Sequence, residues 1–560
     1  MRSLHLCTPF ALAALTLAGC ETPPPETPAK PIATTPPTAP PAPPVVVRLL
    51  AFNDFHGNIK PPGGHVPKVD GDVGGAGWFG AHLKALGAGK PDTIIVAAGD
   101  LIGASPLSSG LFHDEPTVEI MNAFGLSVTA LGNHEFDEGT AELLRMKNGG
   151  CHPKDGCQFD PNFPGAKYDI LGANVRSTKD NSLFMPAYVV REVSGIPIAF
   201  VGMPLAGTPR TVTPGGTAGL TFADEVATAN ALVPELRAKG IETMILLIHE
   251  GGEVEHPGLD ECTDIKGPIV KIVENLDPAY DAVVSGHTHQ LYNCIIAKRP
   301  VTSAYAFGRV ITAIDLTIDP KTKDVIKSEA HNHAVTHDLP PDPAVMEIVD
   351  KAAKMAGPLE NRIIGTITET LTSRRSGNHL SSGLGTVIAD AELEATKKAG
   401  AKVALVNSSG IRGDILFGTK NGAEKTVDGQ VTYGEAFATQ PFGNELVTLT
   451  VNGADFTKLI ERYINAGAPI EASEGFVAEF TTDGKHRTIT EIKIGGAKIS
   501  ATSKVRLTTN SYLADHDAEL KSGTDRTLGP GDMAAFESYF KAHPKIAPPK
   551  KPRFVEKAAK

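Results

Sequence analysis

Beyond its N-terminal segment, this 560-residue chain lacks any run of residues long and apolar enough to cross a membrane. It also lacks an excess of basic residues: 53 Lys and Arg stand against 64 Asp and Glu, which gives a formal net charge of −11. Capture of a nucleic-acid polymer depends on Lys and Arg neutralising many phosphates, so this charge opposes such a partner. Its six cysteines form no compact cluster of the kind that ligates zinc.

The first twenty residues have the pattern of an export signal. Arg2 supplies a positive start, residues 10–17 form an apolar run, and Leu17-Ala18-Gly19-Cys20 is a small-residue cleavage site. A cysteine directly after Leu-Ala-Gly resembles the bacterial lipobox. The resemblance implies that Cys20 is lipidated and anchors an exported chain to a bacterial membrane, in the periplasm or at the cell surface. The alternative is a plain secretory peptide with an incidental cysteine.

Four cysteines remain after Cys7 and Cys20 are set aside. An even number in an oxidising compartment favours disulfides. On sequence proximity alone, we expect Cys151 to pair with Cys157 and Cys262 with Cys294. The alternative is that some of them are free.

The stretch 46–338 alternates short apolar runs with helical patterns, which predicts an α/β layered domain. The expected strands are 46–52, 93–98, 127–131, 196–201, 243–248 and 282–285, and the expected helices are 78–86, 140–147, 224–239 and 267–275. Polar residues come directly after these strands. Open α/β sheets bind ligands outside the carboxyl ends of their strands, so these residues are candidates for a site.

Composition divides the rest of the chain. Residues 21–45 are rich in Pro, Thr and Ala, which predicts an extended spacer. A Pro-rich break is followed by a helical pattern at 344–354, so residues 339–357 are expected to form a linker with a hinge at Ala356-Gly357-Pro358. A second α/β (α+β) domain is expected at 358–545, and a loosely ordered Lys/Pro-rich tail at 546–560.

Five segments that follow strands carry carboxylate, amide or imidazole side chains. Taken singly, each segment is weak evidence for a functional site, because a lone Gly-Asp is usually a turn and a lone His-x-His is usually a polar loop. Five in order, each at a strand end, indicate a metal site, and their ligand types suit Zn, Mn or a similar divalent ion. The segments are Asn53-Asp54-Phe55-His56, Gly99-Asp100, Gly132-Asn133-His134-Glu135, His249-Glu250-Gly251-Gly252 and Gly286-His287-Thr288-His289.

This ordered set resembles the calcineurin-like metallophosphoesterase superfamily. The resemblance implies a layered β-sandwich flanked by helices and two divalent ions. One ion would be held by Asp54, His56 and His289, the other by Asn133, His249 and His287, with Asp100 bridging them. Two such cations lower the pKa of a shared water, so that hydroxide exists near neutral pH, and hold the phosphate oxygens during attack.

The same resemblance gives His134 a catalytic role beside the phosphate, where it stabilises the transition state or protonates the leaving oxygen. Asp137, three residues later, would accept the other imidazole N–H and orient the ring. The alternative is a His-Asp pair that merely caps the next helix.

Two later motifs, Asn407-Ser408-Ser409-Gly410-Ile411-Arg412 and Gln440-Pro441-Phe442-Gly443-Asn444, resemble the second domain of the 5'-nucleotidase family. The resemblance implies that Asn407 and Arg412 contact a nucleotide and that Phe442 stacks on its base. Stacking suits broad specificity, since every base offers a π face. The alternative for Phe442 is core packing.

Asn510-Ser511-Tyr512-Leu513 resembles the segment that supplies the opposing aromatic ring, so Tyr512 would complete a sandwich around the base. The family follows it with Gly-Gly-Asp, whereas this chain has Ala514-Asp515-His516-Asp517. That departure leaves the substrate-binding aspartate open between Asp515 and Asp517. Arg374 or Arg375 matches a further substrate-binding arginine weakly, and a solvated surface pair is the alternative.

The leading hypothesis is two-metal-dependent hydrolysis of nucleoside 5'-monophosphates to nucleoside and phosphate. The same motifs also fit cleavage of diphosphates in nucleotide sugars or dinucleotides, or of 2',3'-cyclic nucleotides. A hypothesis of another class is a surface-displayed binding module with a structural metal site, but His134 and Asp137 would then have no task. The native ion and the oligomeric state are not readable from the sequence.

Overall fold

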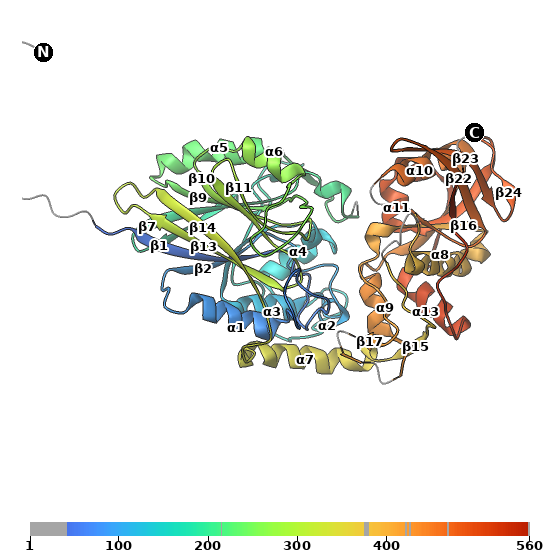
Figure 1. Cartoon of the computed structure of the whole chain (residues 1–560), viewed down its shortest axis with the longest axis horizontal. Helices are drawn as coiled ribbons and strands as arrows, with labels where there is room; N and C mark the ends of the chain where they lie inside the picture. The colour runs from blue at the N-terminus through green and yellow to red at the C-terminus, as the bar shows by residue number, and fades with distance from the viewer. Residues whose placement is uncertain are drawn as a thin grey trace, which may run out of the picture. The chain divides into compact units, whose positions relative to one another are not determined.

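The N-terminal domain is built on two six-stranded β-sheets (Figure 1). The structure is a computed structural model that describes residues 42–213, 215–373, 380–420, 423–424, 427–466 and 470–557. The first sheet has the order β14 (Val325–Ala334), β13 (Val310–Ile318), β1 (Val45–Phe52), β2 (Thr93–Ala97), β3 (Leu126–Ala130) and β4 (Asp169–Leu171). The second has the order β11 (Leu291–Ile296), β12 (Arg299–Ala304), β10 (Tyr280–Ser285), β9 (Thr243–His249), β7 (Ile196–Pro204) and β6 (Tyr188–Val193).

The two sheets pack face to face, and helices cover their outer faces. Along β1, Leu49 and Ala51 lie in the core between the sheets, whereas Leu50 and Phe52 face the other way. Successive strand side chains point to opposite faces, so a strand buried on both faces is a continuous apolar run. The outer face of the first sheet packs against α1 (Ala76–Gly87), α3 (Glu115–Phe124) and α7 (Pro343–Glu360), and that of the second against α5 (Glu225–Ala238) and α6 (Pro268–Glu274) (Figure 1). This arrangement confirms the predicted α/β sandwich flanked by helices.

The six predicted strands correspond to β1, β2, β3, β7, β9 and β10, and the four predicted helices to α1, α4 (Thr140–Asn148), α5 and α6. The prediction missed the hairpin of β11 and β12, and it missed β13 and the edge strand β14, which also pair antiparallel. The linker helix is also longer than expected. Asp342 caps the start of α7, and the helix continues to Glu360, so Ala356-Gly357-Pro358 lie inside it and not at its end. Pro358 lacks only one N–H in the last turn, and the Asn361 amide still donates to Gly357 O at 2.9 Å.

The C-terminal part contains a five-stranded sheet with the order β21 (Ile470–Ala472), β16 (Val403–Asn407), β25 (Lys504–Asn510), β20 (Glu445–Asn452) and β26 (Thr524–Gly531). One face packs against α10 (Gly453–Asn465) and a four-stranded sheet of β24 (Ala497–Lys498), β23 (His486–Ile494), β22 (Phe476–Asp483) and β27 (Phe554–Glu556). The other face packs against α8 (Gly383–Thr396) and α13 (Asp532–Ala542). Shorter helices are α9 (Tyr433–Thr439), α11 (Ser511–His516) and α12 (Ala518–Lys521). This mixture of sheets and helices confirms the predicted second α/β fold.

Both expected disulfides are present. Cys151 pairs with Cys157 in the loop after α4, and Cys262 pairs with Cys294 of β11. Proximity in sequence therefore identified the correct partners.

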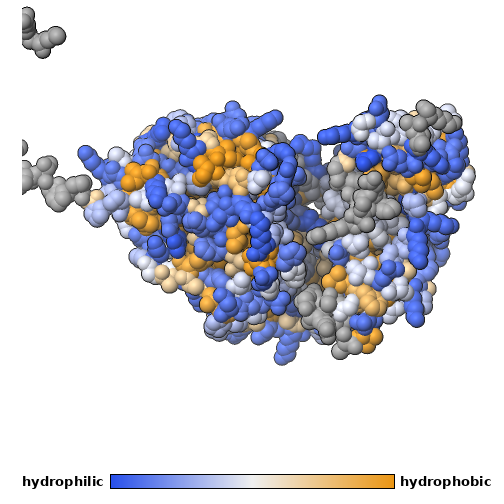
Figure 2. Space-filling view, in the orientation of Figure 1, coloured by the Kyte–Doolittle hydropathy of each residue, from blue (hydrophilic) through white to orange (hydrophobic). Residues whose placement is uncertain are grey.

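Within the described ranges, no helix is both long enough and apolar enough to cross a membrane. The face drawn in Figure 2 is mostly hydrophilic, with hydrophobic side chains in scattered patches. Small dispersed patches of this kind are normal on proteins. Cys20 lies outside the described residues, so its lipidation stays a prediction.

Candidate metal centre and substrate site

The predicted metal-binding segments all lie at the carboxyl ends of parallel strands. β1, β2 and β3 run parallel in one sheet, and β7, β9 and β10 run parallel in the other. Neighbouring parallel strands end at the same edge of a sheet, so the residues that follow them are brought together. Asp54 and His56 follow β1, Asp100 follows β2, Asn133 and His134 follow β3, His249 ends β9, and His287 and His289 follow β10.

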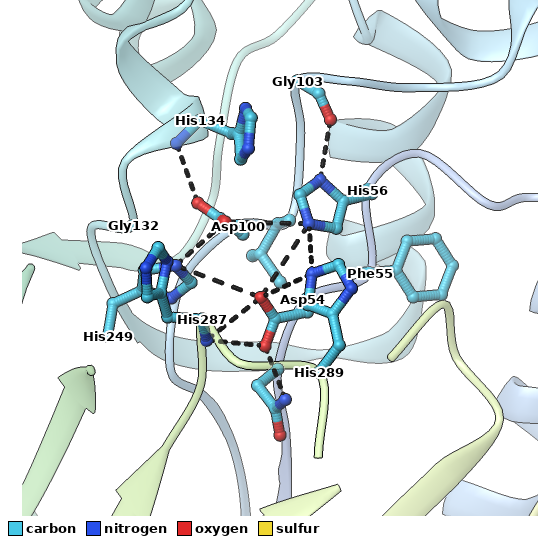
Figure 3. Close-up of polar contacts among 12 residues, drawn as sticks. Asp54, Phe55, His56, Asp100, Gly103, Gly132, His134, His249, His287 and His289 are labelled. Carbon is cyan, nitrogen blue, oxygen red and sulfur yellow. Dashed lines mark hydrogen bonds and ion pairs between the residues drawn. The ribbon is translucent and has the colours of Figure 1, made fainter. Parts of the chain in front are cut away.

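These side chains form three overlapping groups with metal-binding geometry (Figure 3). One group consists of Asp54, His56 and His289, and another of Asp100, His249 and His287; the third, His56, Asp100 and His134, shares one residue with each of these two groups. His56 Nε2 lies 3.1 Å from His289 Nε2, and His249 Nε2 lies 2.9 Å from Asp100 Oδ2. Asp100 Oδ2 is also 3.6 Å from His56 Nε2. Asp100 therefore lies between the two groups, as a bridging carboxylate must.

Backbone carbonyls hold two of the imidazoles in a metal-binding orientation. His56 Nδ1 lies 2.9 Å from Gly103 O, and His249 Nδ1 lies 2.7 Å from Ala98 O. A carbonyl can only accept, so each Nδ1 carries a proton, and Nε2 is the ring nitrogen that is available to a cation. Both Nε2 atoms face the centre of the site.

Two buried atoms in the site lack a well-aligned hydrogen bond: His249 Nε2, whose near neighbour is Asp100 Oδ2 at 2.9 Å, and Asn133 Oδ1. Their residues are 0 % and 1 % exposed. Leaving such an atom unpaired costs about 1–3 kcal/mol, which a bound cation would offset. Both are atoms that the sequence predicts as ligands, and the mixture of imidazole, carboxylate and amide suits Zn or Mn. The residues present therefore fit divalent metal ions.

The turns that carry the predicted ligands have unusual backbone conformations. Left-handed φ angles are uncommon for residues other than glycine and concentrate at functional sites. One neighbouring turn also requires glycine, since a Cβ at Gly132 would lie 2.1 Å from Asp100 Oδ1. Five ligands have positive φ: Asp54 (50°), His56 (47°), Asp100 (51°), His287 (71°) and His289 (52°).

Opposite charges in the site shift the pKa of several groups. Burial opposes ionisation of Asp54, but the neighbouring His289 outweighs it and lowers the pKa of Asp54 to about 2. Burial also opposes protonation of His249, yet Asp100 raises its pKa to about 10. Burial lowers the pKa of His287 to about 4. The carboxylates are therefore ionised at neutral pH, as metal ligands must be.

No role was predicted from the sequence for two residues that position the site, Glu135 and Asn53, although both lie in the segments that follow the strands. Glu135 accepts hydrogen bonds from the amides of Asp100 (3.0 Å), Leu101 (2.8 Å) and Gly132 (2.6 Å). Asn53 donates to Asp54 Oδ2 at 2.6 Å and accepts from the Ala304 amide at 2.7 Å. Their buried polar side chains next to predicted ligands were the available signal.

His134 lies beside Asp100 and is paired with Asp137. Its amide donates to Asp100 Oδ1 at 2.8 Å, and its Nδ1 lies 2.8 Å from Asp137 Oδ2. The next helix, α4, is capped by Gly139 with no side-chain hydrogen bond. The pair therefore does not serve as the cap of that helix, and His134 Nε2 is left for another partner.

The C-terminal part contributes Phe442 and Arg412 to the surroundings of His134. The Phe442 ring stacks on the His134 ring with centroids 5.8 Å apart, and Arg412 Cζ lies 5.8 Å from the Phe442 centroid. Phe442 is half-buried, whereas the alternative of core packing would bury its ring fully. The Asn407 side chain contacts Ser409 Oγ at 3.1 Å and accepts from Asn510 at 2.8 Å.

The remaining predicted substrate residues have other contacts. The Tyr512 ring stacks on His516 at 4.5 Å, and its hydroxyl donates to Arg210 O at 2.9 Å. Asp517 pairs with Arg462, and Asp515 pairs with Arg526. Arg374 and Arg375 lie outside the described residues. A substrate role for any of these residues stays a prediction.

A cavity of about 860 Å³ adjoins the metal-binding groups. Its lining includes His289, Tyr305, Phe307, Arg309 and Arg412. Pockets for small ligands have volumes of about 300–1,000 Å³. The cavity therefore has room for a ligand of nucleotide size beside the metal centre.

Comparison with known proteins identifies both parts of the chain. Residues 47–291 match the calcineurin-like phosphoesterase model, and residues 363–522 match the 5'-nucleotidase, C-terminal domain model.

Individual relatives extend over most of the chain. Endonuclease YhcR of Bacillus subtilis is 31 % identical over 511 residues; the alignment covers 89 % of this chain but only 40 % of that protein. The NAD 5'-nucleotidase of Haemophilus influenzae is 24 % identical over 590 residues, covering 89 % of this chain and 91 % of that protein. The crystal structure of a 5'-nucleotidase precursor from Thermus thermophilus superposes with a TM-score of 0.74 at 21 % identity, covering 92 % of this chain and all of that one, which supports the fold. The chain therefore belongs to the 5'-nucleotidase family, with a calcineurin-like phosphoesterase domain followed by a 5'-nucleotidase C-terminal domain.

Proposed function

We propose that this chain is a metal-dependent phosphoesterase that releases phosphate from nucleoside 5'-monophosphates. The observation that carries the proposal is the pair of His/Asp groups that meet at Asp100, with His134 beside them. A binding module with a structural metal site would need neither the His134–Asp137 pair nor a cavity next to the site. The chain spans only 40 % of the length of the Bacillus subtilis endonuclease to which it is similar.

Asp54, His56 and His289 would hold one divalent cation, and Asn133, His249 and His287 would hold the other, with Asp100 shared by both. Bound cations supply an activated water and neutralise the charge of the phosphate. The buried Glu135 holds the Asp100 turn through three amides, and Asn53 holds Asp54. These contacts keep the ligand atoms in place when substrate arrives.

His134 would hold or donate a proton at Nε2 near the leaving oxygen. Asp137 Oδ2 lies 2.8 Å from His134 Nδ1 and accepts a hydrogen bond from it, which keeps a proton on Nδ1. Burial opposes the charged ring, but Asp137 and Asp100 outweigh it and raise the pKa of His134. Its side chain is 11 % exposed, so the ring is not fully enclosed.

The C-terminal residues would recognise the nucleoside. Arg412 carries positive charge toward the phosphate, and Phe442 offers a ring face to the base. Asn407 is fixed by Asn510 and Ser409, so its amide is held ready for a substrate hydroxyl. Tyr512 would supply the opposing ring.

The chain is further proposed to be exported and tethered through a lipid on Cys20, with residues 21–45 as a spacer. Two disulfides suit an oxidising compartment. Metabolic labelling with a radioactive fatty acid should label the natural chain and leave Cys20→Ala unlabelled. Equal labelling of both chains would contradict the anchor.

A panel of substrates tests the proposed reaction. Hydrolysis is measured with Mn or Zn added, by phosphate release from nucleoside 5'-monophosphates and by chromatography of the products from a dinucleotide, a nucleotide sugar, a 2',3'-cyclic nucleotide and DNA. The proposal predicts the highest kcat/KM on 5'-monophosphates. A higher kcat/KM on a diphosphate or cyclic substrate would support the proposed site but change the proposed substrate. No hydrolysis of any of these substrates would overturn the proposal.

A further inference from the structure

A second cluster of side chains that could bind a metal ion lies in the N-terminal domain, separate from the site at the strand ends. The disulfide loop 151–157 carries His152 and Asp155, which face His113 in the turn before α3. His113 Nε2 lies 3.0 Å from Asp155 Oδ2, and His152 Nδ1 lies 3.2 Å from the same oxygen. All three ligand atoms lie within 4.8 Å of one another.

The spacing of these atoms suits a small tetrahedral cation. Zinc bonds to nitrogen and oxygen are about 2.0–2.2 Å long, so ligand atoms in a tetrahedral site lie roughly 3.3–3.5 Å apart. The two distances to Asp155 Oδ2 are slightly shorter than this edge. Two imidazoles and one carboxylate are a common zinc donor set, with the fourth position left to water.

A fourth residue orients the central imidazole. Glu138 Oε2 lies 2.7 Å from His113 Nδ1 and accepts its proton, so His113 Nε2 is directed at Asp155. A carboxylate behind a histidine is the usual outer partner of a zinc ligand. Glu142 also lies near His113, but its carboxylate is bound by Arg145. Glu142 is therefore not counted as a ligand.

The loop holds its two side chains in a closed arrangement. The Cys151–Cys157 disulfide joins its ends, and His152 and Gly156 exchange backbone hydrogen bonds of 3.2 and 2.9 Å. The His113 and His152 rings stack with centroids 4.0 Å apart. The Asp155 side chain is 54 % exposed, which gives an ion a path from solvent.

Without an ion, a proton occupies the position between His113 and Asp155. Both His113 ring nitrogens lie within hydrogen-bond distance of a carboxylate, Nδ1 of Glu138 and Nε2 of Asp155. An ion at Nε2 replaces this proton, which leaves to solvent. His152 Nδ1 must also give up the 3.1 Å hydrogen bond from the Asp155 amide. Binding is therefore an exchange of one proton for one cation, with a local rearrangement of His152.

We propose that His113, His152 and Asp155 form a zinc-binding site of their own. The ion would fasten the disulfide loop to the turn before α3. Glu138, which accepts from His113, directly follows Asp137 in the sequence, and Asp137 accepts from His134. An ion bound to His113 would therefore also steady the segment that holds His134. The inference does not rest on the proposed reaction, because its test is a count of bound zinc.

The test is equilibrium dialysis of the full chain against zinc, followed by elemental analysis. His152→Ala should hold one zinc fewer per chain than the natural protein. Lys154→Ala, in the same loop but outside the donor set, should hold the natural number. Equal zinc in the His152→Ala and natural chains would overturn the site.

Two further measurements decide the matter if His152→Ala folds poorly. Asp155→Asn keeps the size of the side chain and removes its charge, and it should also lose one zinc. Anomalous diffraction at the zinc edge from crystals of the natural chain should give a peak surrounded by His113, His152 and Asp155. Full zinc in a folded Asp155→Asn chain, or no peak at this position, would contradict the proposal.

Discussion

At the scale of single residues, His134 differs from two of the predicted ligands in the partner of its Nδ1. The Asp137 carboxylate accepts from Nδ1 of His134, whereas the backbone carbonyls of Gly103 and Ala98 accept from Nδ1 of His56 and His249. A charged partner stabilises the protonated imidazole, which favours a group that holds and gives up a proton.

His134→Ala should keep the bound metal and lower kcat on nucleotides by about 10²–10⁴-fold, the usual contribution of a general acid or base. Metal content is measured by elemental analysis and kcat by phosphate release. Asp137→Asn is the matched variant: it keeps the shape but loses the charge, so it should lower kcat by less. Loss of metal in His134→Ala would make His134 a ligand and refute its assigned role.

Phe442→Ala should weaken nucleotide substrates selectively. Stacking of a base on an aromatic ring is worth about 1–3 kcal/mol, which corresponds to roughly 5- to 150-fold in kcat/KM on a nucleoside monophosphate. The ester p-nitrophenyl phosphate has no base and should be affected much less. Since Phe442 also stacks on His134, an equal loss on both substrates would instead assign it to positioning that ring.

At the scale of elements, the site depends on tight turns after parallel strands. The turn after β9 approaches the turn after β10 so closely that Gly251 has no room for a side chain. A Cβ there would lie 2.4 Å from Gly286 O and 2.4 Å from Thr288 Oγ1. These two residues flank His287, so this close approach helps to fix a predicted ligand.

Gly251→Ala should therefore lower the free energy of unfolding by about 1–3 kcal/mol, the usual cost of overpacking, and weaken metal binding. Gly215→Ala is the matched control, because a Cβ there meets nothing within 4 Å. Urea unfolding and zinc titration of both variants test the expectation. Natural stability and metal affinity in Gly251→Ala would show that the two turns can separate freely.

The sequence predicted best those elements whose signal is local. β1, β2, β3, β7, β9 and β10 are apolar runs buried on both faces, and each is followed by a polar motif. The pairing of β11 with β12, and of β13 with β14, depends on contacts between strands that a single apolar run does not encode. The end of α7 was placed too early, before Ala356-Gly357-Pro358, whereas the helix continues through these residues to Glu360.

The grouping of the metal-binding residues was predictable, since strand ends meet at one edge of a sheet. Glu135 and Asn53 were not assigned roles, because only the fold shows which amides they face. The cluster at His113 was likewise invisible, as His113 and His152 are far apart in sequence and become neighbours only through the loop 151–157.

At the scale of the whole molecule, the predicted metal ligands precede α7 and the predicted base-binding residues follow it. Phe442 stacks on His134, so the face of Phe442 that meets His134 is closed to a base. Turnover should therefore require the two parts to separate and close around the substrate. Such motion concentrates in a few residues at element ends, which places the dihedral changes after Glu360, at Asn361 and Arg362.

A cross-link that holds this arrangement tests the motion. Cysteines placed at Thr211 and Ser511, next to the Arg210–Tyr512 contact, can be joined by a photocleavable reagent that leaves the native disulfides intact. The cross-linked chain should keep its metal and lose nucleotide turnover, and light should restore it. The uncross-linked double variant is the control. Full turnover while cross-linked would show that no separation is needed.

If divalent ions shared at Asp100 enable this chain to release phosphate from nucleotides, removal of those ions should stop the reaction. The direct measurement is phosphate release from adenosine 5'-monophosphate by the chelator-treated chain, before and after Mn or Zn is restored, beside Asp100→Ala. We expect no release without metal, recovery with metal, and neither recovery nor full metal binding in Asp100→Ala. Undiminished release by the metal-free chain, or natural metal content and turnover in Asp100→Ala, would contradict this expectation.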